Sequence, residues 1–431
     1  MTHRKVAFVV AMAAFFAGSS SGLFAQHKTS PHAMSLDFFL KRLDEEKTSF
    51  GKFRFLAGPE VKGNSELKGW AAQLLATNYS FLGRPNDAIR EFPIHDQTKA
   101  PLGLPDTASF AAVPATDWIA DQAGAYGVIM VNEAHHKPQT RLLTLSLLPR
   151  LRRLGFSYFA VEALGENPLK AGYPTADTGY YTSEPVFAEL VREASRLGYT
   201  LVPYEADKNE SDTSQQARET GQAKRLADVI AKDPNARILV HAGYGHIQER
   251  AASQPADADP MAFEFMRLTR LSVLTIDQTR LTWEDGLAAG RLAKEFAIKG
   301  PSVLIDRDSG NAWTAFPGTF DASVVLPAVD ASKVRPDWLD LGGSRRAVSV
   351  DMVPCIGHLP CLAEARHAEE SDQAIPADQF VVLNSAEMSQ PLYLAPGNYR
   401  VRLLGNDGAT LTETPLQVPA ASAPPHSAKT P

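Results

Sequence analysis

Between residues 126 and 276 the chain alternates short apolar runs with longer amphipathic stretches. The apolar runs predict buried strands at Tyr126–Val131, Tyr158–Val161, Thr200–Pro203, Arg237–Val240 and Leu271–Ile276. Between them, Leu, Ala and Val recur at three- and four-residue spacing, which predicts helices at Pro138–Leu154, Glu184–Leu197 and Asp212–Lys232. Strands that alternate with helices of this length indicate βαβ crossovers and a parallel sheet. We therefore expect an α/β domain over residues 119–325.

The pattern before this domain is helical. Residues 35–95 carry apolar positions at helical spacing around a Gly83-Arg84-Pro85 turn, which predicts a helical hairpin that packs on the α/β domain. The hairpin resembles half of a tetratricopeptide unit, but no second copy follows, and such arrays need about three repeats to bury a core. Residues 96–118 contain several Pro, Thr and Asp and predict a linker, so the lead-in and its linker cover 26–118.

After about residue 315 the helical spacing fades. Phe380–Leu383, Gln390–Leu394 and Asn398–Leu404 are predicted as antiparallel strands, with a hairpin turn at 395–398. These strands belong to a small antiparallel β module at 335–418. The Pro-, Ala- and Ser-rich residues 419–431 predict a disordered tail.

The first 25 residues have the order of a signal peptide. Arg4 and Lys5 precede an apolar run at 6–15, and small residues follow at 18–22. This run is shorter than the roughly 20 residues that cross a bilayer, and no later segment is long and charge-free enough to do so. We expect residues 1–25 to be cleaved, the protein to be periplasmic or secreted, and no stable membrane insertion.

Composition narrows the class of partner. The chain is 44% hydrophobic and 21% charged, as in globular proteins, and its net charge of -6 comes without a sustained basic face. Because phosphate backbones require clustered Lys and Arg, we expect no nucleic-acid partner. The sequence shows no Gly-x-Ser-x-Gly elbow at a strand end and no Walker or dinucleotide glycine pattern, which argues against a serine hydrolase and against ATP or NAD.

The two cysteines, Cys355 and Cys361, lie in the segment CIGHLPC. An exported setting favours a short-loop disulfide between them. Together with His358 they also make a Cys-x2-His-x2-Cys triplet, which is one ligand short of a closed zinc site. We expect the disulfide.

Residues that carry chemistry follow the predicted strands. In chain order they are Glu133, His135 and His136, then Glu162, then Glu205 and Asp207, then His241 and His246. The carboxyl ends of parallel strands meet at one edge of a sheet, where α/β proteins bind their ligands. Each residue alone is more often a helix cap or a loop residue, but four of the eleven histidines fall in two of these short segments. The combination predicts one site.

The segments VIMVNEAHH, YFAVEAL and ILVHAGYGHI resemble, in order and spacing, the superfamily of erythromycin esterases, ChaN-type haem-binding lipoproteins, and Tiki and TraB proteins. The resemblance covers residues 120–325. It implies an α/β domain in which Glu133, His135, Glu162, Arg218 and His246 form the site. Asn132 stands where the superfamily has a turn glycine, and Asn tolerates left-handed backbone better than most residues.

The resemblance leaves three functions open. In the first, as in Tiki proteins, His135, Glu162 and His246 bind a divalent metal that activates water against a peptide. In the second, as in the esterases, His135 is a general base held by Glu133 or Glu162, and His246 with Arg218 stabilises an oxyanion.

In the third, as in ChaN-type proteins, the domain binds haem or another ligand without turnover, with Tyr173, Tyr180 and Tyr181 as candidate iron ligands. We expect a hydrolase acting on a small-molecule or peptide ester or amide. His136, Glu205, Asp207 and His241 are expected to line its site.

Overall fold

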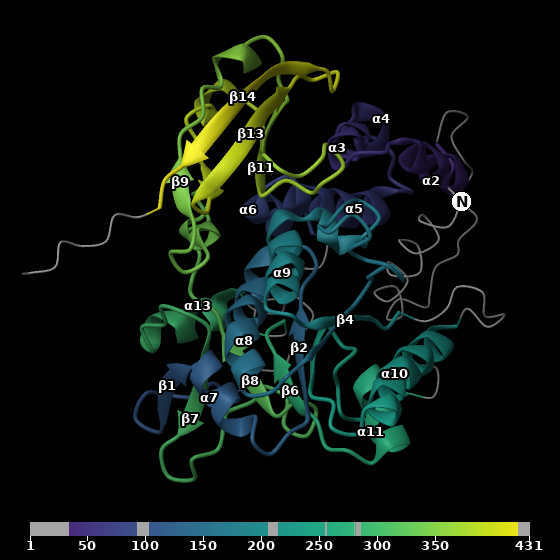
Figure 1. Ribbon diagram of the computed structural model, residues 1–431, viewed down its shortest axis with the longest axis vertical. Helices are drawn as coiled ribbons and strands as arrows, with labels where there is room; N and C mark the ends of the chain where they lie inside the picture. Colours follow the sequence, from purple (N-terminus) through teal and green to yellow (C-terminus); the bar gives the residue numbers. More distant parts are fainter. Residues whose placement is uncertain are drawn as a thin grey trace, which may run out of the picture.

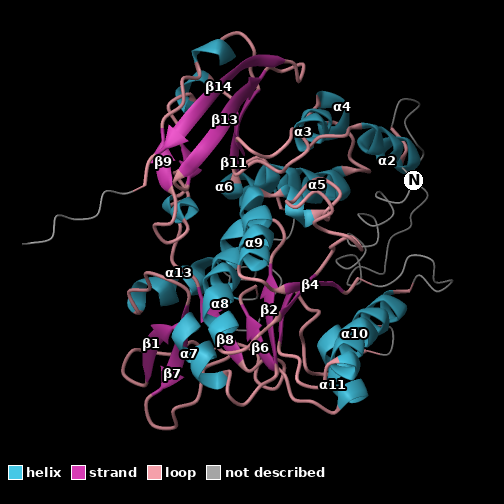
Figure 2. Cartoon of the chain, in the orientation of Figure 1, coloured by secondary structure: helices cyan, strands magenta, loops and turns pink. Residues whose placement is uncertain are grey.

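The structure, a computed structural model, describes residues 34–92, 103–205, 214–254, 257–279, 281 and 286–420. The α/β domain lies at one end of the molecule, and the C-terminal β module lies at the other, beside a layer of N-terminal helices (Figures 1 and 2). The predicted signal peptide, residues 93–102 of the predicted linker, Asp207 and the tail from 421 lie outside the described residues.

An eight-stranded sheet organises the α/β domain, with the order β1-β7-β8-β6-β2-β5-β3-β4. Six neighbouring strands, from β8 to β4, pair in parallel, and among the described strands of this sheet only β7 runs the other way. This confirms the predicted α/β fold. The strands are β1 (Phe110–Pro114), β2 (Val128–Glu133), β3 (Tyr158–Val161), β4 (Thr200–Pro203), β5 (Ile238–Gly243), β6 (Leu274–Asp277), β7 (Ser302–Asp306) and β8 (Ala322–Val325).

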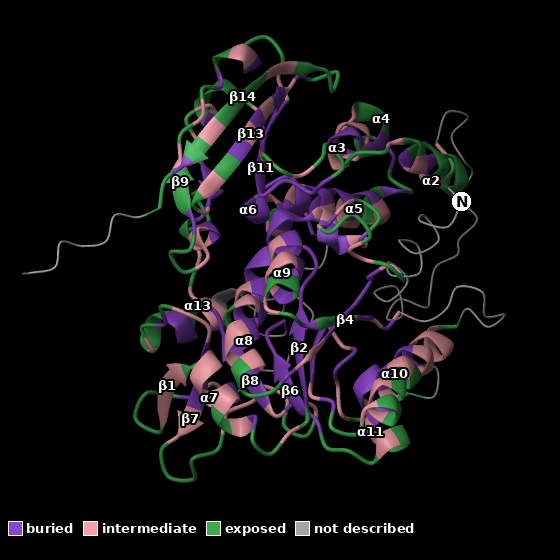
Figure 3. Cartoon of the chain, in the orientation of Figure 1, coloured by how far each residue is buried: buried purple, intermediate pink, exposed green. Residues whose placement is uncertain are grey.

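Helices cover both faces of the sheet, so the central strands are buried on both sides (Figure 3). Within β2, Ile129 and Val131 pack toward α7 (Ala115–Gln122), α8 (Arg141–Arg153) and α9 (Pro185–Arg196). Val128 and Met130 pack toward α10 (Gln215–Lys232) and α11 (Met261–Thr269). Because both faces of these strands are buried, their sequences are continuous apolar runs and do not alternate apolar with polar residues.

One further helix belongs to this domain. The short helix α13 (Gly286–Glu295) packs near β7 and β8 through Leu292. Over the described part of the chain, no helix is both long and apolar enough to span a bilayer.

Part of the predicted linker belongs to the sheet. Residues 110–114 form β1, which pairs antiparallel with β7, and α7 follows directly at 115–122. The prediction of a linker through residue 118 is therefore wrong. The strand FAAVP is Ala-rich and half-buried, so it lacks the β-branched run that marks the other strands.

The N-terminal helices are α2 (Leu36–Glu45), α3 (Ser49–Leu56), α4 (Pro59–Lys62), α5 (Lys68–Phe81) and α6 (Pro85–Glu91). Ser35 and Thr48 cap α2 and α3 by accepting hydrogen bonds from backbone N–H groups. The apolar core of this layer closes mainly on Leu362 and Val381 of the β module. The expectation that the helices pack on the α/β domain holds for Phe81 and Phe92, whereas the apolar core of the layer is shared with the β module.

The C-terminal module has a four-stranded antiparallel sheet of order β11-β10-β13-β14 and a two-stranded sheet of β9 and β12. The strands are β9 (Arg346–Val348), β10 (Cys361–His367), β11 (Asp378–Val382), β12 (Leu392–Leu394), β13 (Gly397–Leu404) and β14 (Thr410–Val418). The predicted hairpin at 395–398 is wrong, because β12 pairs with β9 whereas β13 pairs with β10 and β14. The turn there moves the chain from one sheet to the other.

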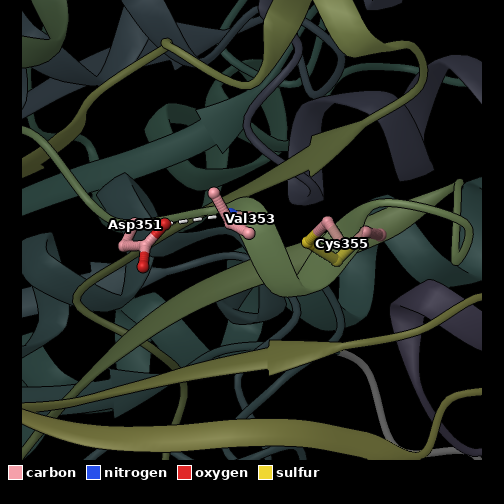
Figure 4. The surroundings of a disulfide bond; sticks show 4 residues. Asp351, Val353 and Cys355 are labelled. Atoms are coloured by element: carbon pink, nitrogen blue, oxygen red, sulfur yellow. Dashed lines mark hydrogen bonds between the residues drawn. A yellow bond between two sulfur atoms is a disulfide. The ribbon is translucent and has the colours of Figure 1, made fainter.

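A disulfide joins Cys355 to Cys361 at the start of β10 (Figure 4). The turn before it is fixed by Asp351, whose carboxylate accepts a hydrogen bond from the backbone N–H of Val353 at 3.0 Å. Both sulfurs are buried and bonded to each other, so they offer no thiolate to a metal at His358.

A buried ion pair fastens the helical layer to the β module. Arg84, between α5 and α6, donates from Nη1 and Nη2 to the two carboxylate oxygens of Glu387 at 2.7 and 3.0 Å. Nη1 also donates to the carbonyl of Val381 at 3.0 Å, and the backbone N–H of Leu383 donates to Glu387 at 2.8 Å. Burial raises the pKa of Glu387, but the hydrogen bonds from Arg84 and Leu383 outweigh it and lower the pKa below 4.5.

We predict that Glu387→Gln lowers the free energy of unfolding at pH 7 by about 2 kcal/mol, because the buried Arg84 loses one of its two carboxylate partners and keeps only Asp87. A lowered carboxyl pKa stabilises the fold above pH 4.5, and this contribution is lost as the pH falls further. Urea unfolding at pH 7 and pH 3.5 checks both statements. The control Glu45→Gln removes an exposed pair with Arg42 and changes stability by less than about 1 kcal/mol. An equal loss for Glu387→Gln at both pH values contradicts the assignment.

Candidate functional site

The predicted site residues meet at the carboxyl edge of four adjacent strands, β2, β5, β3 and β4. Glu133 ends β2, and Glu162 and Glu205 lie just beyond β3 and β4. His241 and Gly243 belong to β5, and the turn that follows carries His246. Arg218 reaches the same edge from α10. Contacts among the described residues join Glu133, His135, Glu162, Arg218 and His246 into two neighbouring clusters.

Glu133 is the hub of the first cluster and is 1% exposed. Its Oε1 accepts from Nδ1 of His135 at 2.8 Å, and its Oε2 accepts from Nε of Arg141 at 2.5 Å. Nε2 of His241 lies 3.3 Å from Oε2, close enough for a charge interaction but poorly aligned for a hydrogen bond. Burial raises the pKa of Glu133, but Arg141 and the two histidines outweigh it and hold the pKa well below 4.5.

The ring of His135 is fixed on its faces and at one nitrogen. It stacks on Tyr181 with 3.7 Å between ring centroids and meets the edge of Tyr244 at 4.9 Å. An ionised carboxylate only accepts hydrogen bonds, so Nδ1 of His135 carries a proton toward Glu133. Its other nitrogen, Nε2, faces Gly243, where a β-carbon would lie under 3.0 Å from both Nε2 and the Glu162 carboxylate. Glycine at 243 therefore leaves space where these two side chains converge.

Arg218 is the centre of the second cluster. Its Nη2 donates to Glu162 at 2.8 Å and to Glu205 at 3.1 Å, and its Nε donates to Glu205 at 2.8 Å. Nη1 lies 3.1 Å from Nε2 of His246. These contacts use four of the five guanidinium N–H hydrogens, so one hydrogen on Nη1 has no acceptor among the described residues. Burial raises the pKa of Glu162, but His246, His135 and Arg218 outweigh it and lower the pKa to about 2.

His246 is held by Glu219, a residue of α10 that sequence patterns did not mark. Oε2 of Glu219 lies 2.8 Å from Nδ1 of His246 and also accepts the backbone N–H of Met261, which starts α11. Burial lowers the pKa of His246, but Glu219 and Glu162 outweigh it, so the pKa is raised above 6.5. In the neutral form Nε2 accepts from Arg218, and in the protonated form it faces Glu162 Oε1 at 3.5 Å.

The residues expected to line the site have different positions. His136 is buried between Phe92, on which it stacks at 3.8 Å, and the hydroxyl of Tyr244 at 2.9 Å. Burial, with a smaller effect of Lys137, lowers the pKa of His136 to about 3. His241 lies behind Glu133, with Thr144 Oγ1 at 3.0 Å from its Nδ1. Glu205 forms an ion pair with Arg218 and is therefore part of the second cluster.

Asn132 is part of strand β2 and has no left-handed backbone. Its amide links neighbouring strand ends instead. Nδ2 donates to the carbonyl of Tyr244 and to Asp277, both at 2.8 Å, and Oδ1 accepts from the backbone N–H of Gln278 at 2.7 Å. Asn132 therefore cross-links the ends of neighbouring strands under the turn.

Sequence analysis also missed Arg141 and Glu184, which support the first cluster. Arg141 is the first residue of α8 and is fully buried, and Glu184 caps α9. A signal was present in the sequence, since Arg141 opens a Leu-rich helix and Glu184 precedes Pro185, the order of an N-cap. This signal indicates where the two helices begin, but it does not indicate that Arg141 and Glu184 contact each other.

The metal hypothesis does not fit the donors. In the described part of the chain, no three or more His, Cys, Asp and Glu side chains are grouped to hold a metal ion. One oxygen of Glu162 accepts from Arg218 and the other from the backbone N–H of Gly243. Nε2 of His246 faces the same guanidinium. Glu162 and His246 thus contact a resident cation, Arg218, and with His135 they form no metal-binding geometry among the described residues.

Two of the three candidate haem tyrosines, Tyr180 and Tyr181, contact each other with 5.0 Å between ring centroids, whereas Tyr173 contacts the β module. Tyr173 accepts a hydrogen bond from the backbone N–H of Ser371 at 3.1 Å, in the β module. Tyr180 packs on Phe81, and Tyr181 stacks on His135. Burial raises the pKa of both Tyr180 and Tyr181, which disfavours the phenolate that would bind iron.

Comparisons with known proteins give distant likenesses. No protein-family model matches the sequence, and no curated protein is significantly similar to it. The type III effector HopBA1 is 14% identical, with a TM-score of 0.28 over 43% of this chain and 89% of that one. RRSP, a MARTX toxin effector domain from Vibrio vulnificus CMCP6, is 12% identical, with a TM-score of 0.28 over 56% and 46%. A structure described as bacterial protein toxins is 11% identical, with a TM-score of 0.29 over 56% and 47%. At these TM-scores the likenesses carry no argument about this chain.

We predict that Gly243→Ala displaces the ring of His135 and costs about 1–3 kcal/mol of stability, because the added methyl overlaps His135 and Glu162. The ¹⁵N shifts of the His135 ring and urea unfolding check the two effects. Gly69→Ala is the matched control, since it adds a methyl within α5 where nothing lies within 4 Å, and it raises stability by about 0.5–1 kcal/mol. An unshifted His135 ring in Gly243→Ala contradicts the described geometry.

Proposed function

We propose that this protein is an exported hydrolase of the erythromycin esterase/ChaN-like type that cleaves an ester or peptide bond without a metal. The observation that carries the proposal is the pairing of His135 with an ionised, buried Glu133 while Nε2 of His135 faces Gly243 and Glu162. In this arrangement the imidazole has a fixed orientation, and its Nε2 is the nitrogen that Glu133 does not bind.

In the proposed reaction His135 Nε2 removes a proton from a water molecule as the oxygen attacks the substrate carbonyl. Glu133 stays ionised and stabilises the imidazolium that forms. As the tetrahedral intermediate collapses and the bond to the alkoxide or amine breaks, this imidazolium donates its proton to the leaving group, which restores neutral His135. This division of roles resembles other His–carboxylate pairs, in which the carboxylate orients the ring but does not take the proton.

Negative charge develops on the carbonyl oxygen as water attacks. The Nη1 hydrogen of Arg218 that lacks an acceptor among the described residues can donate to this oxygen, and His246 supports the guanidinium from the side. A donor that is already fixed by Glu162 and Glu205 needs no rearrangement during the reaction, which is the source of most oxyanion stabilisation. The same ion pairs keep the charge of Arg218 in place in a buried setting.

Two further observations favour this mechanism over the other two. The oxygens of Glu162 are already occupied by N–H donors, which disfavours the metal-dependent route. Burial raises the pKa of the two adjacent tyrosines, Tyr180 and Tyr181, which disfavours the phenolate that haem iron would bind. Residues 1–25 are proposed to direct the export of the chain.

We expect His135→Gln to lower kcat by about 10²- to 10⁴-fold on any ester or peptide substrate, because the general base is removed. A panel of nitrophenyl esters and a mixed peptide library, assayed with the full mature chain, checks this. His358→Gln is the control, since His358 is exposed in the disulfide loop and leaves kcat unchanged. The absence of any turnover by the wild-type chain, or full activity of His135→Gln, contradicts the proposed function.

Elemental analysis of the same purified protein tests the metal-free mechanism separately. Activity that survives dialysis against a chelator, in protein that carries less than stoichiometric divalent metal, supports it. Stoichiometric metal that disappears in His135→Ala and His246→Ala overturns it, even if the chain is a hydrolase.

A further inference from the structure

Arg141 is a charged residue without contact to the bulk solvent. It is the first residue of α8, and its side chain is 0% exposed. The guanidinium donates to both oxygens of Glu133, from Nε at 2.5 Å and from Nη2 at 3.3 Å. Nη1 donates to Glu184 at 2.7 Å, and the plane lies over the ring of Phe187 at 4.9 Å. A buried cation is tolerated only with such partners.

One contact separates Arg141 from an ordinary structural ion pair. Its Nη2 also donates to the backbone carbonyl of His135 at 3.1 Å. The same guanidinium thus holds the backbone of His135 and the carboxylate that binds the ring of His135.

The far side of Arg141 is also fixed. Glu184 is the N-cap of α9 and accepts backbone N–H groups of Val186 and Phe187 at 2.9 and 2.8 Å. These two bonds and the burial of the helix start prevent Glu184 from moving toward solvent, and Arg141 with it. Burial raises the pKa of Glu184 despite Arg141, whereas Arg141 is the largest of the causes that hold the pKa of Glu133 well below 4.5.

We propose that Arg141 is a positioning residue that selects the tautomer of His135, with the proton on Nδ1 and the lone pair on Nε2. The inference rests on the proposed function for its catalytic meaning, since Nε2 is the base there. With Arg141 present, Glu133 is a carboxylate and can only accept, so Nδ1 must be the donor.

Without the guanidinium, burial dominates and Glu133 takes up a proton. A protonated Glu133 donates to Nδ1, and the ring proton moves to Nε2, where it blocks the base. Loss of Arg141 therefore removes activity without touching the reacting atoms. A purely structural ion pair would instead change stability and leave the tautomer as it was.

The test uses the full mature chain with ¹⁵N-labelled histidine. The ring signals of His135 are assigned by their loss in His135→Gln, and the ¹⁵N shifts at pH 7 report which nitrogen carries the proton. We expect the proton on Nδ1 in the wild type and in Glu184→Gln, which keeps the Arg141–Glu133 pair. In Arg141→Met we expect the proton on Nε2 and, where a substrate is known, a fall in kcat of about 10³-fold.

Arg335→Met is the matched control, because Arg335 is equally buried and paired with Asp378 in the β module. It loses stability but keeps the wild-type tautomer of His135. Should Arg141→Met fail to fold, Arg141→Gln carries the test, since it keeps a polar side chain but removes the charge beside Glu133, and we expect the proton on Nε2; Arg141→Lys, which retains the charge, keeps it on Nδ1. A proton on Nε2 in the wild type, or an unchanged tautomer in folded Arg141→Met or Arg141→Gln, overturns the inference.

The tautomer of His135 is measured without any substrate, so the positioning role and the proposed function can fail separately. A tautomer that depends on Arg141 in a chain that hydrolyses nothing refutes the proposed function and keeps the positioning role. Hydrolysis that requires His135 but proceeds at the wild-type rate and with the wild-type tautomer in Arg141→Met refutes only the positioning role.

Discussion

The burial of one negative charge, that of Glu133, is the constraint on which the centre of this structure depends. An isolated carboxylate at the end of a buried central strand would cost several kcal/mol, and in most settings it would take up a proton instead. Here it is compensated by Arg141 from α8, by His135 from its own turn and by His241 from β5. The compensation fixes where α8 begins and how the strand ends meet. The same contacts therefore determine both the geometry of the site and the packing at this edge of the sheet.

The second cluster also surrounds a buried charge, but this charge is the positive one of Arg218. Around Arg218 lie Glu162, Glu205 and His246, and Glu219 holds His246 from behind. The two clusters face each other across Gly243, one built on a carboxylate and the other on a guanidinium. A base beside the first and a donor within the second are what attack on a carbonyl requires. The arrangement supplies both charges from side chains, which is why a metal has no role in the proposed mechanism.

The parallel core and most of the proposed site could be predicted because local pattern determines them. The predicted strands at 158–161 and 200–203 match β3 and β4, since a strand buried on both faces leaves a continuous apolar run. Glu133, His135, Glu162 and His246 follow from their positions after strands, because parallel strands bring such residues to one edge. The β1 strand did not follow, since FAAVP carries no such run, and the turn at 395–398 gave no sign of which strands its two arms pair with.

Partner choice is what the sequence could not provide. Arg141 and Glu184 are 43 residues apart and meet only because α8 and α9 start at the same edge. Arg84 and Glu387 are 303 residues apart, and their contact decides that the N-terminal helices share a core with the C-terminal module. A charged residue at a helical position is predicted to be exposed to solvent unless its ion-pair partner is known. The residues that orient a site are therefore harder to predict than those that act in it, since strand ends mark the latter and only the assembled fold identifies the former.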